Sequence, residues 1–146
     1  MEDIDTMVPP GKDKEEDDHT VEDYLEAIVV LRDMKGSEEI RSVDLANMRN
    51  VSKASVNKAL SIMREKGYVE QERYGRITLT PSGLEYGTAV WNRHRMLRSF
   101  LVDELGVEPQ EANREACLME HAISEDTMQK WEAYMGRREA EKKAAE

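Results

Sequence analysis

Apolar positions recur every three or four residues in several stretches of the chain, and this spacing predicts amphipathic helices. The first such stretch, "VEDYLEAIVVLRDMKG", directly follows Thr20. Thr20 and Asp23 have the spacing of a capping box, so we predict that a helix begins after Thr20 and ends near Gly36. Its apolar face comprises Val21, Tyr24, Leu25, Ile28 and Leu31.

The segment "RSVDLANMRNVSKASVNKALSIMREKGYV" predicts two further helices joined by a tight turn. Ser42 and Ser52 are the expected N-caps, and Gly67 is the expected left-handed residue after the second helix. The positions predicted to be buried are Val43, Leu45, Ala46 and Met48 in the first helix, and Val56, Ala59, Leu60 and Met63 in the second.

Apolar and polar residues alternate in "YVEQERYGRITLT", which predicts a β-hairpin with Gly75 in its turn. Two helices followed by a hairpin form a winged helix-turn-helix, in which the second helix enters the major groove of DNA. Hydroxyl and amide side chains there would read base edges, and cations would contact phosphates. The predicted DNA-binding residues are Ser52, Lys53, Ser55, Asn57 and Lys58 on the helix, and Arg73 and Arg76 on the hairpin.

A long helix is predicted after the hairpin, with Thr80 as N-cap, Pro81 in the first position and an end at Gly106. Gly83 and Gly87 lie inside this helix, where they either weaken its first turns or permit close packing.

Two more helices follow, one opening at Pro109 and one that Ser124 caps and that runs through Met135. The predicted fold class is therefore mainly α, with a winged helix-turn-helix DNA-binding domain followed by an all-helical dimerisation domain. The expected divisions are a disordered acidic tail over 1–19, the DNA-binding domain over 20–80, the helical domain over 81–136 and a solvated end over 137–146.

The net charge of −10 argues against nucleic-acid binding until it is divided along the chain. Residues 1–40 carry −10, residues 41–80 carry +4 and residues 81–146 carry −4. The predicted DNA-binding segment is thus a basic island in an acidic protein, as phosphate contacts require. The alternative is a helix-turn-helix-like core that binds another protein, with its basic residues merely solvated.

Other classes of protein find little support in the sequence. No apolar run approaches the roughly 18 residues that span a bilayer, and the acidic N-terminus has no apolar signal region. One cysteine cannot form an internal disulfide, so we expect a cytoplasmic protein. No nucleophile motif, phosphate-binding loop or cofactor fingerprint is present, so we do not predict an enzyme.

Candidate metal ligands cluster in "EACLMEHAIS", where Cys117, Glu120 and His121 stand at i, i+3 and i+4 and share one helix face. Thiolate, carboxylate and imidazole all bind first-row divalent metals. The competing interpretation is that Cys117 is a buried apolar residue, as single cysteines often are.

Three more candidate ligands lie on two other predicted helices. Asp23 and Glu26 are one turn apart on the first helix, and His94 lies midway along the long helix. The alternatives are that Asp23 belongs only to a capping box, and that His94, between Arg93 and Arg95, faces solvent. Six donors meeting in one place would hold one or two metal ions.

The chain resembles the diphtheria toxin repressor family of metal-dependent regulators, in particular its shorter manganese transport regulator branch. The resemblance covers roughly residues 20–136, and it rests on "VEDYLEAI", "SVNKAL…KGYV", "ITLTPSG", "NRHRMLRSFL" and "CLMEHAIS". It implies a homodimeric repressor of metal-ion homeostasis genes that binds a palindromic operator when metal is bound. The long helix and the two after it match the family's dimerisation domain.

The resemblance also implies a ligand set of Asp23, Glu26, His94, Cys117, Glu120 and His121. Cys117 departs from the manganese branch, which has a glutamate there, and agrees with the iron-responsive branch. Arg98 stands near a further glutamate ligand of iron-type members, so their ancillary site looks incomplete here. The expected metal is Fe²⁺ or Mn²⁺, with a slight preference for Fe²⁺ because a thiolate favours softer ions, whereas Zn²⁺, Co²⁺ or Ni²⁺ would also bind in vitro.

In the expected mechanism, a metal ion ties the DNA-binding and dimerisation domains together and limits the spread of the two recognition helices. Metal and DNA then bind with positive, reciprocal coupling. The alternative function is a winged-helix regulator that responds to another ligand or another transition metal, with Cys117 structural.

Overall fold

The computed structural model describes residues 12–36, 39–71 and 75–145. The chain forms two compact units, of which the first ends at Gly87 and the second begins at Thr88. Each unit has its own cluster of buried apolar side chains. The fold is mainly helical, as the periodicity predicted.

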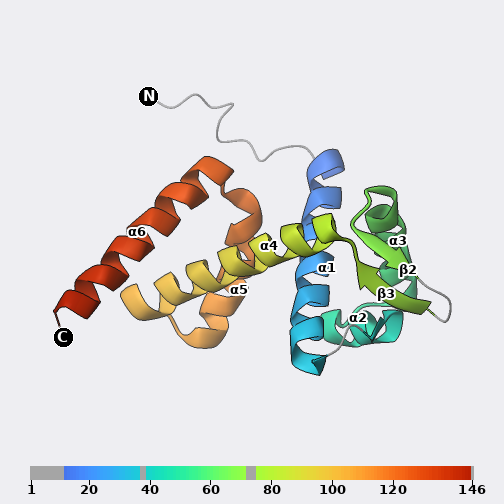
Figure 1. Ribbon diagram of the computed structural model, residues 1–146, viewed down its shortest axis with the longest axis horizontal. Helices are drawn as coiled ribbons and strands as arrows, with labels where there is room; N and C mark the ends of the chain where they lie inside the picture. Colours follow the sequence, from blue (N-terminus) through green and yellow to red (C-terminus); the bar gives the residue numbers. More distant parts are fainter. Residues whose placement is uncertain (1–11, 37–38, 72–74, 146) are drawn as a thin grey trace. The chain divides into compact units, whose positions relative to one another are not determined.

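The first unit contains three helices and a small sheet. Its elements are α1 (Lys12–Lys35), β1 (Ile40–Arg41), α2 (Ser42–Arg49), α3 (Lys53–Glu65), β2 (Val69–Gln71) and β3 (Arg76–Leu79) (Figure 1). The strands are antiparallel in the order β1-β3-β2, with Val69 opposite Leu79 and Ile40 opposite Ile77. The predicted winged helix-turn-helix is confirmed, whereas β1 is too short to show an alternating pattern.

The first helix starts earlier than the sequence predicted. It begins at Lys12, so the expectation that Thr20 caps it is wrong, and part of the expected tail is helical. The segment "KDKEEDDHT" is rich in acidic residues, which favour a helix N-terminus without needing an apolar face. The part of that tail that precedes Lys12 lies outside the described residues.

The second helix starts one residue away from its expected position. Ser42 is its first helical residue rather than its cap, and Arg41 is the cap. The carboxylate of Asp44 accepts a hydrogen bond from the Arg41 backbone N–H at 2.8 Å, so the acid of the first turn holds the helix start.

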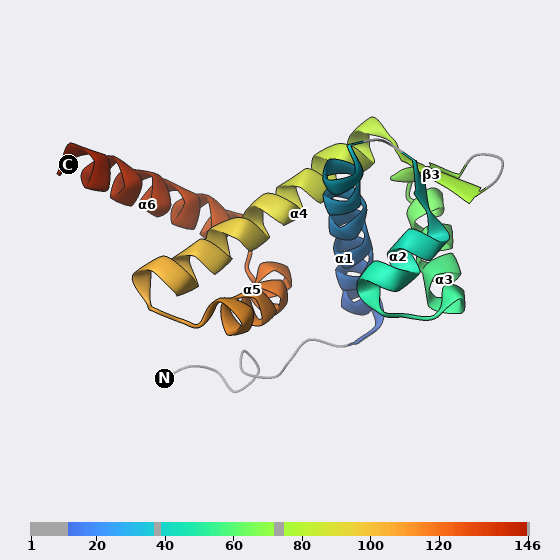
Figure 2. The same cartoon turned by 90° about the horizontal axis from the view of Figure 1, so that it is seen from below.

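The core of the first unit lies where α1, α2 and α3 meet the sheet. Figure 1 and Figure 2 both show these three helices side by side. The four positions predicted to be buried on α3 are indeed buried. On α2 the prediction is largely wrong, because only Leu45 is buried, while Val43 and Met48 are exposed. This helix has 8 residues and packs along a single side.

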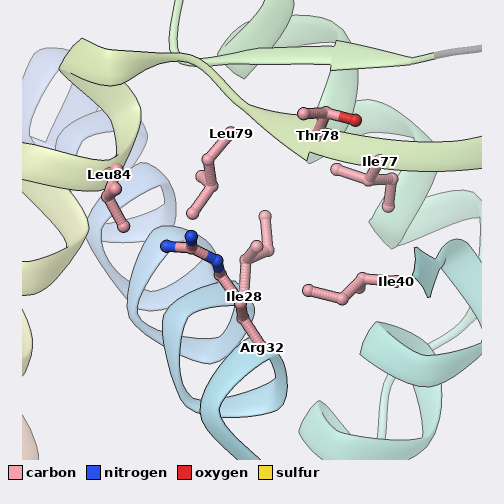
Figure 3. Close-up of a pocket in the computed structure, with 7 residues that line it drawn as sticks. All are labelled: Ile28, Arg32, Ile40, Ile77, Thr78, Leu79 and Leu84. Carbon is pink, nitrogen blue, oxygen red and sulfur yellow. The ribbon is translucent and has the colours of Figure 1, made fainter. Parts of the chain in front are cut away.

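Helix α1 packs against the sheet around a small cavity of about 40 Å³ (Figure 3). Ile28 of α1, Ile40 of β1 and Ile77 of β3 are each about 1% exposed, so their side chains are fully buried there. This apolar contact fixes α1 within the first unit.

The start of α4 (Pro81–Ser99) requires two glycines. A Cβ on Gly83 would lie 2.0 Å from the backbone oxygen of Tyr68, and one on Gly87 would lie 2.8 Å from Val29 Cγ2. Both glycines therefore permit close packing, which was one of the two expectations. The hydroxyl of Thr80 accepts from the Gly83 N–H at 3.1 Å, which confirms the predicted N-cap.

The second unit contains the remainder of α4, the π-helix η3 (Phe100–Glu104), α5 (Pro109–Ala122) and α6 (Glu125–Ala144). The long helix predicted to reach Gly106 instead widens in η3, where the Leu105 N–H donates to the Phe100 carbonyl at 3.3 Å. The predicted helix starts at Pro109 and after Ser124 are confirmed. No helix in the described part of the chain is long and apolar enough to cross a membrane.

Helix α6 runs well beyond Met135, where the sequence had predicted a solvated end. Glu104 of η3 accepts from Arg138 at 3.4 Å and from Lys142 at 3.0 Å. These ion pairs give the exposed last turns of α6 a partner within their own unit.

Candidate metal centre and DNA-contacting surface

Glu120 is the most unusual side chain of the second unit, because its carboxylate is fully buried at 0% exposure. Its Oε2 lies 3.0 Å from Nδ1 of His94 on α4. Its Oε1 lies 3.5 Å from Nε2 of His121, the next residue on α5. A buried carboxylate thus lies between two imidazoles.

His94 is itself only 4% exposed, so it does not face solvent as one alternative supposed. Its Nε2 lies 2.8 Å from the side-chain oxygen of Asn113 on α5. The ring of Trp91 stacks on it, with centroids 5.5 Å apart and planes 10° apart. The imidazole is therefore contacted on both nitrogens and on one face.

The pKa of His94 is raised above its ordinary value. Burial by itself lowers this pKa, and the hydrogen bonds to Glu120 and Asn113, together with the charge of Glu120, outweigh it. Arg98, on the same helix, acts in the opposite direction through its positive charge. Two acceptor oxygens facing one ring favour the doubly protonated imidazolium when no other cation is bound.

Cys117 lies on the same face of α5 as Glu120 and His121. Each of the three residues offers a donor atom, and these sulfur, oxygen and nitrogen atoms all lie within 4.8 Å of one another. The thiol is half-buried and is not in a disulfide. The i, i+3, i+4 spacing therefore brings the three predicted ligands of α5 together.

The residues of this cluster fit a divalent cation. Glu120 Oε1 is buried and has no hydrogen-bond partner among the described residues. Burying an ionised carboxylate without full compensation is costly, and a bound cation supplies that compensation. Nitrogen, oxygen and sulfur donors together suit first-row divalent metals.

Asp23 and Glu26, the other two predicted ligands, belong to the first unit and lie one turn apart on α1. Because α1 begins at Lys12, Asp23 is not part of a capping box at the helix start. One oxygen of Asp23 lies 3.3 Å from the guanidinium of Arg49, which also lies 5.8 Å from the centre of the Tyr24 ring. Asp23 is thereby tied to the last residue of α2.

The predicted DNA-contacting residues of α3 are all exposed. The hydroxyl of Ser52 accepts from the Ser55 N–H at 3.1 Å and donates to the Ser55 hydroxyl at 3.0 Å, so it caps α3 as predicted. Arg76 is exposed on β3, 4.0 Å from Glu39. Arg73 lies outside the described residues.

Sequence reasoning missed Asn113, Trp91 and Arg49 as neighbours of the candidate ligands. Asn113 precedes Cys117 by four positions, which places it on the same helix face, so that spacing could have identified it. Trp91 precedes His94 by one turn in the same way. No sequence pattern could have paired Arg49 with Asp23, because they lie on different helices.

Residues 18–77 match the family described as iron dependent repressor, N-terminal DNA binding domain. Residues 80–144 match the family described as iron dependent repressor, metal binding and dimerisation domain. Together the two matches cover almost all of the described chain.

Individual transcriptional regulators are also similar to this chain over most of its length. An uncharacterised HTH-type transcriptional regulator of Methanocaldococcus jannaschii is 32% identical over 116 residues, which are 80% of this chain and 92% of that protein. The transcriptional regulator MntR of Salmonella typhimurium is 33% identical over 114 residues, or 78% of this chain and 71% of that one.

A solved structure of a manganese-dependent transcriptional repressor in complex with manganese aligns with a TM-score of 0.71 and 33% identity. The alignment covers 80% of this chain and 52% of the other, so this chain spans about half the length of that repressor.

Proposed function

Because this chain belongs to the iron-dependent repressor family of metal-dependent transcriptional regulators, we propose that it represses metal-ion homeostasis genes when Fe²⁺ or Mn²⁺ is bound. The buried carboxylate of Glu120, set between two imidazoles and a thiol, is the observation that carries this proposal.

The proposed ligand set comprises Asp23 and Glu26 of α1, His94 of α4, and Cys117, Glu120 and His121 of α5. The support for the α1 pair is the family resemblance and its one-turn spacing. A bound divalent ion supplies positive charge that offsets the mutual repulsion of the carboxylates. Ligands drawn from both units couple the DNA-binding unit to the dimerisation unit, so metal occupancy changes the affinity for DNA.

Cys117 is the residue that we propose to set the choice of metal. A thiolate strengthens the binding of Fe²⁺ relative to Mn²⁺, for which oxygen and nitrogen donors suffice. Fe²⁺ is therefore slightly favoured over Mn²⁺. The manganese-dependent repressor, which is 33% identical to this chain, is the reason for keeping Mn²⁺ as the second candidate.

The proposed DNA interface is the exposed face of α3, supported by the basic charge of the surrounding segment. Lys53 and Lys58 would contact phosphates, while Ser55 and Asn57 would reach base edges. Arg73 and Arg76 of the wing would contact the backbone beside the groove. A homodimer has two-fold symmetry, so the proposed operator is palindromic.

The test is a mobility-shift assay on the promoter of the protein's own gene, with Fe²⁺, with Mn²⁺ and with a chelator. Affinity should rise with either metal and fall with the chelator. Cys117→Ser and His121→Ala should each weaken the metal response, whereas Glu115→Gln, on the same helix but outside the ligand set, should leave it intact. Unchanged DNA affinity after chelation would contradict a metal switch.

The second candidate is a winged-helix regulator that responds to another ligand, with Cys117 only structural. Under that alternative, Cys117→Ser and His121→Ala would respond to metal as the wild type does. Members of the family are transcriptional regulators, and we propose no catalytic activity for this chain.

A further inference from the structure

His94 is held by acceptor oxygens at both edges of its ring. Nδ1 lies 3.0 Å from Glu120 Oε2, and Nε2 lies 2.8 Å from Asn113 Oδ1. A neutral imidazole carries one N–H, so the partner of one nitrogen decides what the other nitrogen can do. If Nε2 donates to Asn113, Nδ1 presents a lone pair towards Glu120.

The stacking of Trp91 fixes the plane of this ring but not its orientation within the plane. A half-turn of the ring would keep the 10° stacking. It would, however, place carbon atoms opposite Glu120 and Asn113 and remove both hydrogen bonds. The contacts at the ring edges therefore determine which atoms face the carboxylate.

We propose that Asn113 is a positioning residue of the metal centre, whose side-chain oxygen accepts the Nε2–H of His94 and thereby presents Nδ1 to a divalent ion bound by Glu120. Outer partners of metal-binding histidines commonly fix the tautomer in this way, and their loss weakens metal binding about 10- to 100-fold. The proposal rests on the proposed function, because it takes His94 and Glu120 to be ligands.

The position of Asn113 makes the proposal testable without damage to the core. Asn113 lies exposed on α5, and its side-chain oxygen reaches inward to His94. Asn113→Leu removes the acceptor with little change in size. Asn113→Asp keeps an acceptor oxygen in place. Asn92→Leu is the matched control, because Asn92 lies on α4 and its oxygen accepts from Arg95 rather than from His94.

The experiment titrates the full chain with Zn²⁺, a diamagnetic probe, and follows the His94 ring by long-range proton–nitrogen spectra. In the wild type and in Asn113→Asp, Nε2 should carry the hydrogen and Nδ1 should shift on zinc binding. Asn113→Leu should bind Zn²⁺ about tenfold more weakly, and its neutral His94 ring, before metal is added, should be a mixture of the two tautomers. Asn92→Leu should match the wild type.

Wild-type affinity together with a wild-type His94 spectrum in Asn113→Leu would overturn the positioning role while leaving the metal centre intact. Weaker binding with an unchanged tautomer would also overturn it, because Asn113 would then act only on structure. If Zn²⁺ binds the wild type without shifting either ring nitrogen of His94, the ligand assignment of the proposed function fails instead.

Discussion

A single carboxylate sets the chemistry of the second unit. Glu120 has no exposed surface, and its Oε1 accepts no hydrogen bond from the described residues. Such a group lowers the stability of a protein that gains nothing from it. Its presence is explained if its charge is needed to bind a cation.

Glu120→Gln should therefore weaken Mn²⁺ or Fe²⁺ binding by more than about 100-fold, the upper end of what outer-shell partners contribute. The metal-free variant should be less stable than the wild type, because the substitution removes the buried charge that pairs with the His94 imidazolium. Anaerobic metal titration and urea unfolding measure the two effects. Glu115→Gln, on the same helix, is the control and should change neither.

Among the glycines of the described residues, Gly83 is the one at which an added Cβ would meet the closest neighbouring atom. Gly83→Ala should lower the free energy of unfolding by about 2 kcal/mol or more, because the new Cβ would overlap the Tyr68 carbonyl oxygen. Gly136→Ala is the matched control in the interior of α6, where a Cβ meets nothing within 4 Å. That variant should gain about 0.5–1 kcal/mol. Equal effects of the two substitutions in denaturant unfolding would contradict the close packing of α4.

At the scale of elements, helix α2 depends on the acid in its first turn. The pKa of Asp44 is held below its ordinary value, chiefly by the hydrogen bond from the Arg41 backbone N–H, with help from Lys35 at 3.1 Å. A lowered folded-state pKa contributes stability above the unfolded pKa, and this contribution is lost as pH falls through the folded pKa.

Asp44→Asn should accordingly lower stability at neutral pH and reduce the loss of stability upon acidification to about pH 3. Chemical unfolding at a series of pH values measures both effects. Asp33→Asn, at an exposed position of α1, corrects for the general loss of one negative charge. If the free energy of unfolding falls as much upon acidification in Asp44→Asn as in the control, Asp44 does not stabilise the start of α2.

The elements differ in how far the sequence could predict them, and the reasons are local. The cap at Ser52 and the buried face of α3 follow from short-range chemistry and a full helical period. The early start of α1 was missed because the segment before Thr20 is highly charged and carries no apolar pattern from which a helix could be predicted. The widening at η3 was missed because it depends on packing Leu101 into the core, which no periodicity records.

The same distinction applies to the candidate site. The spacing of Cys117, Glu120 and His121 was enough to place their donor atoms together, because all three lie on one helix. The contacts of His94 with Glu120 and Asn113 join two helices, and a single sequence carries no direct record of such pairs.

At the scale of the whole molecule, the acidic chain must approach DNA through its basic segment alone. Lys53→Gln and Lys58→Gln should each weaken binding to all DNA sequences and lower the salt dependence of the affinity by about one counterion. Lys130→Gln removes an equal charge from α6 and should leave the salt slope unchanged. Fluorescence anisotropy at several salt concentrations makes the comparison, and identical slopes for all three variants would contradict a DNA interface on α3.

The three donors on adjacent turns of α5 also have a consequence for the speed of sensing. Their donor atoms lie within 4.8 Å of one another, because all three side chains project from one face of a single helix. Ligands that are already in place need not be gathered from a loose loop, so little conformational search precedes capture. The rate of response should then follow how readily each ion exchanges its own hydration water, and sensing could keep pace with rapid changes in the free metal concentration.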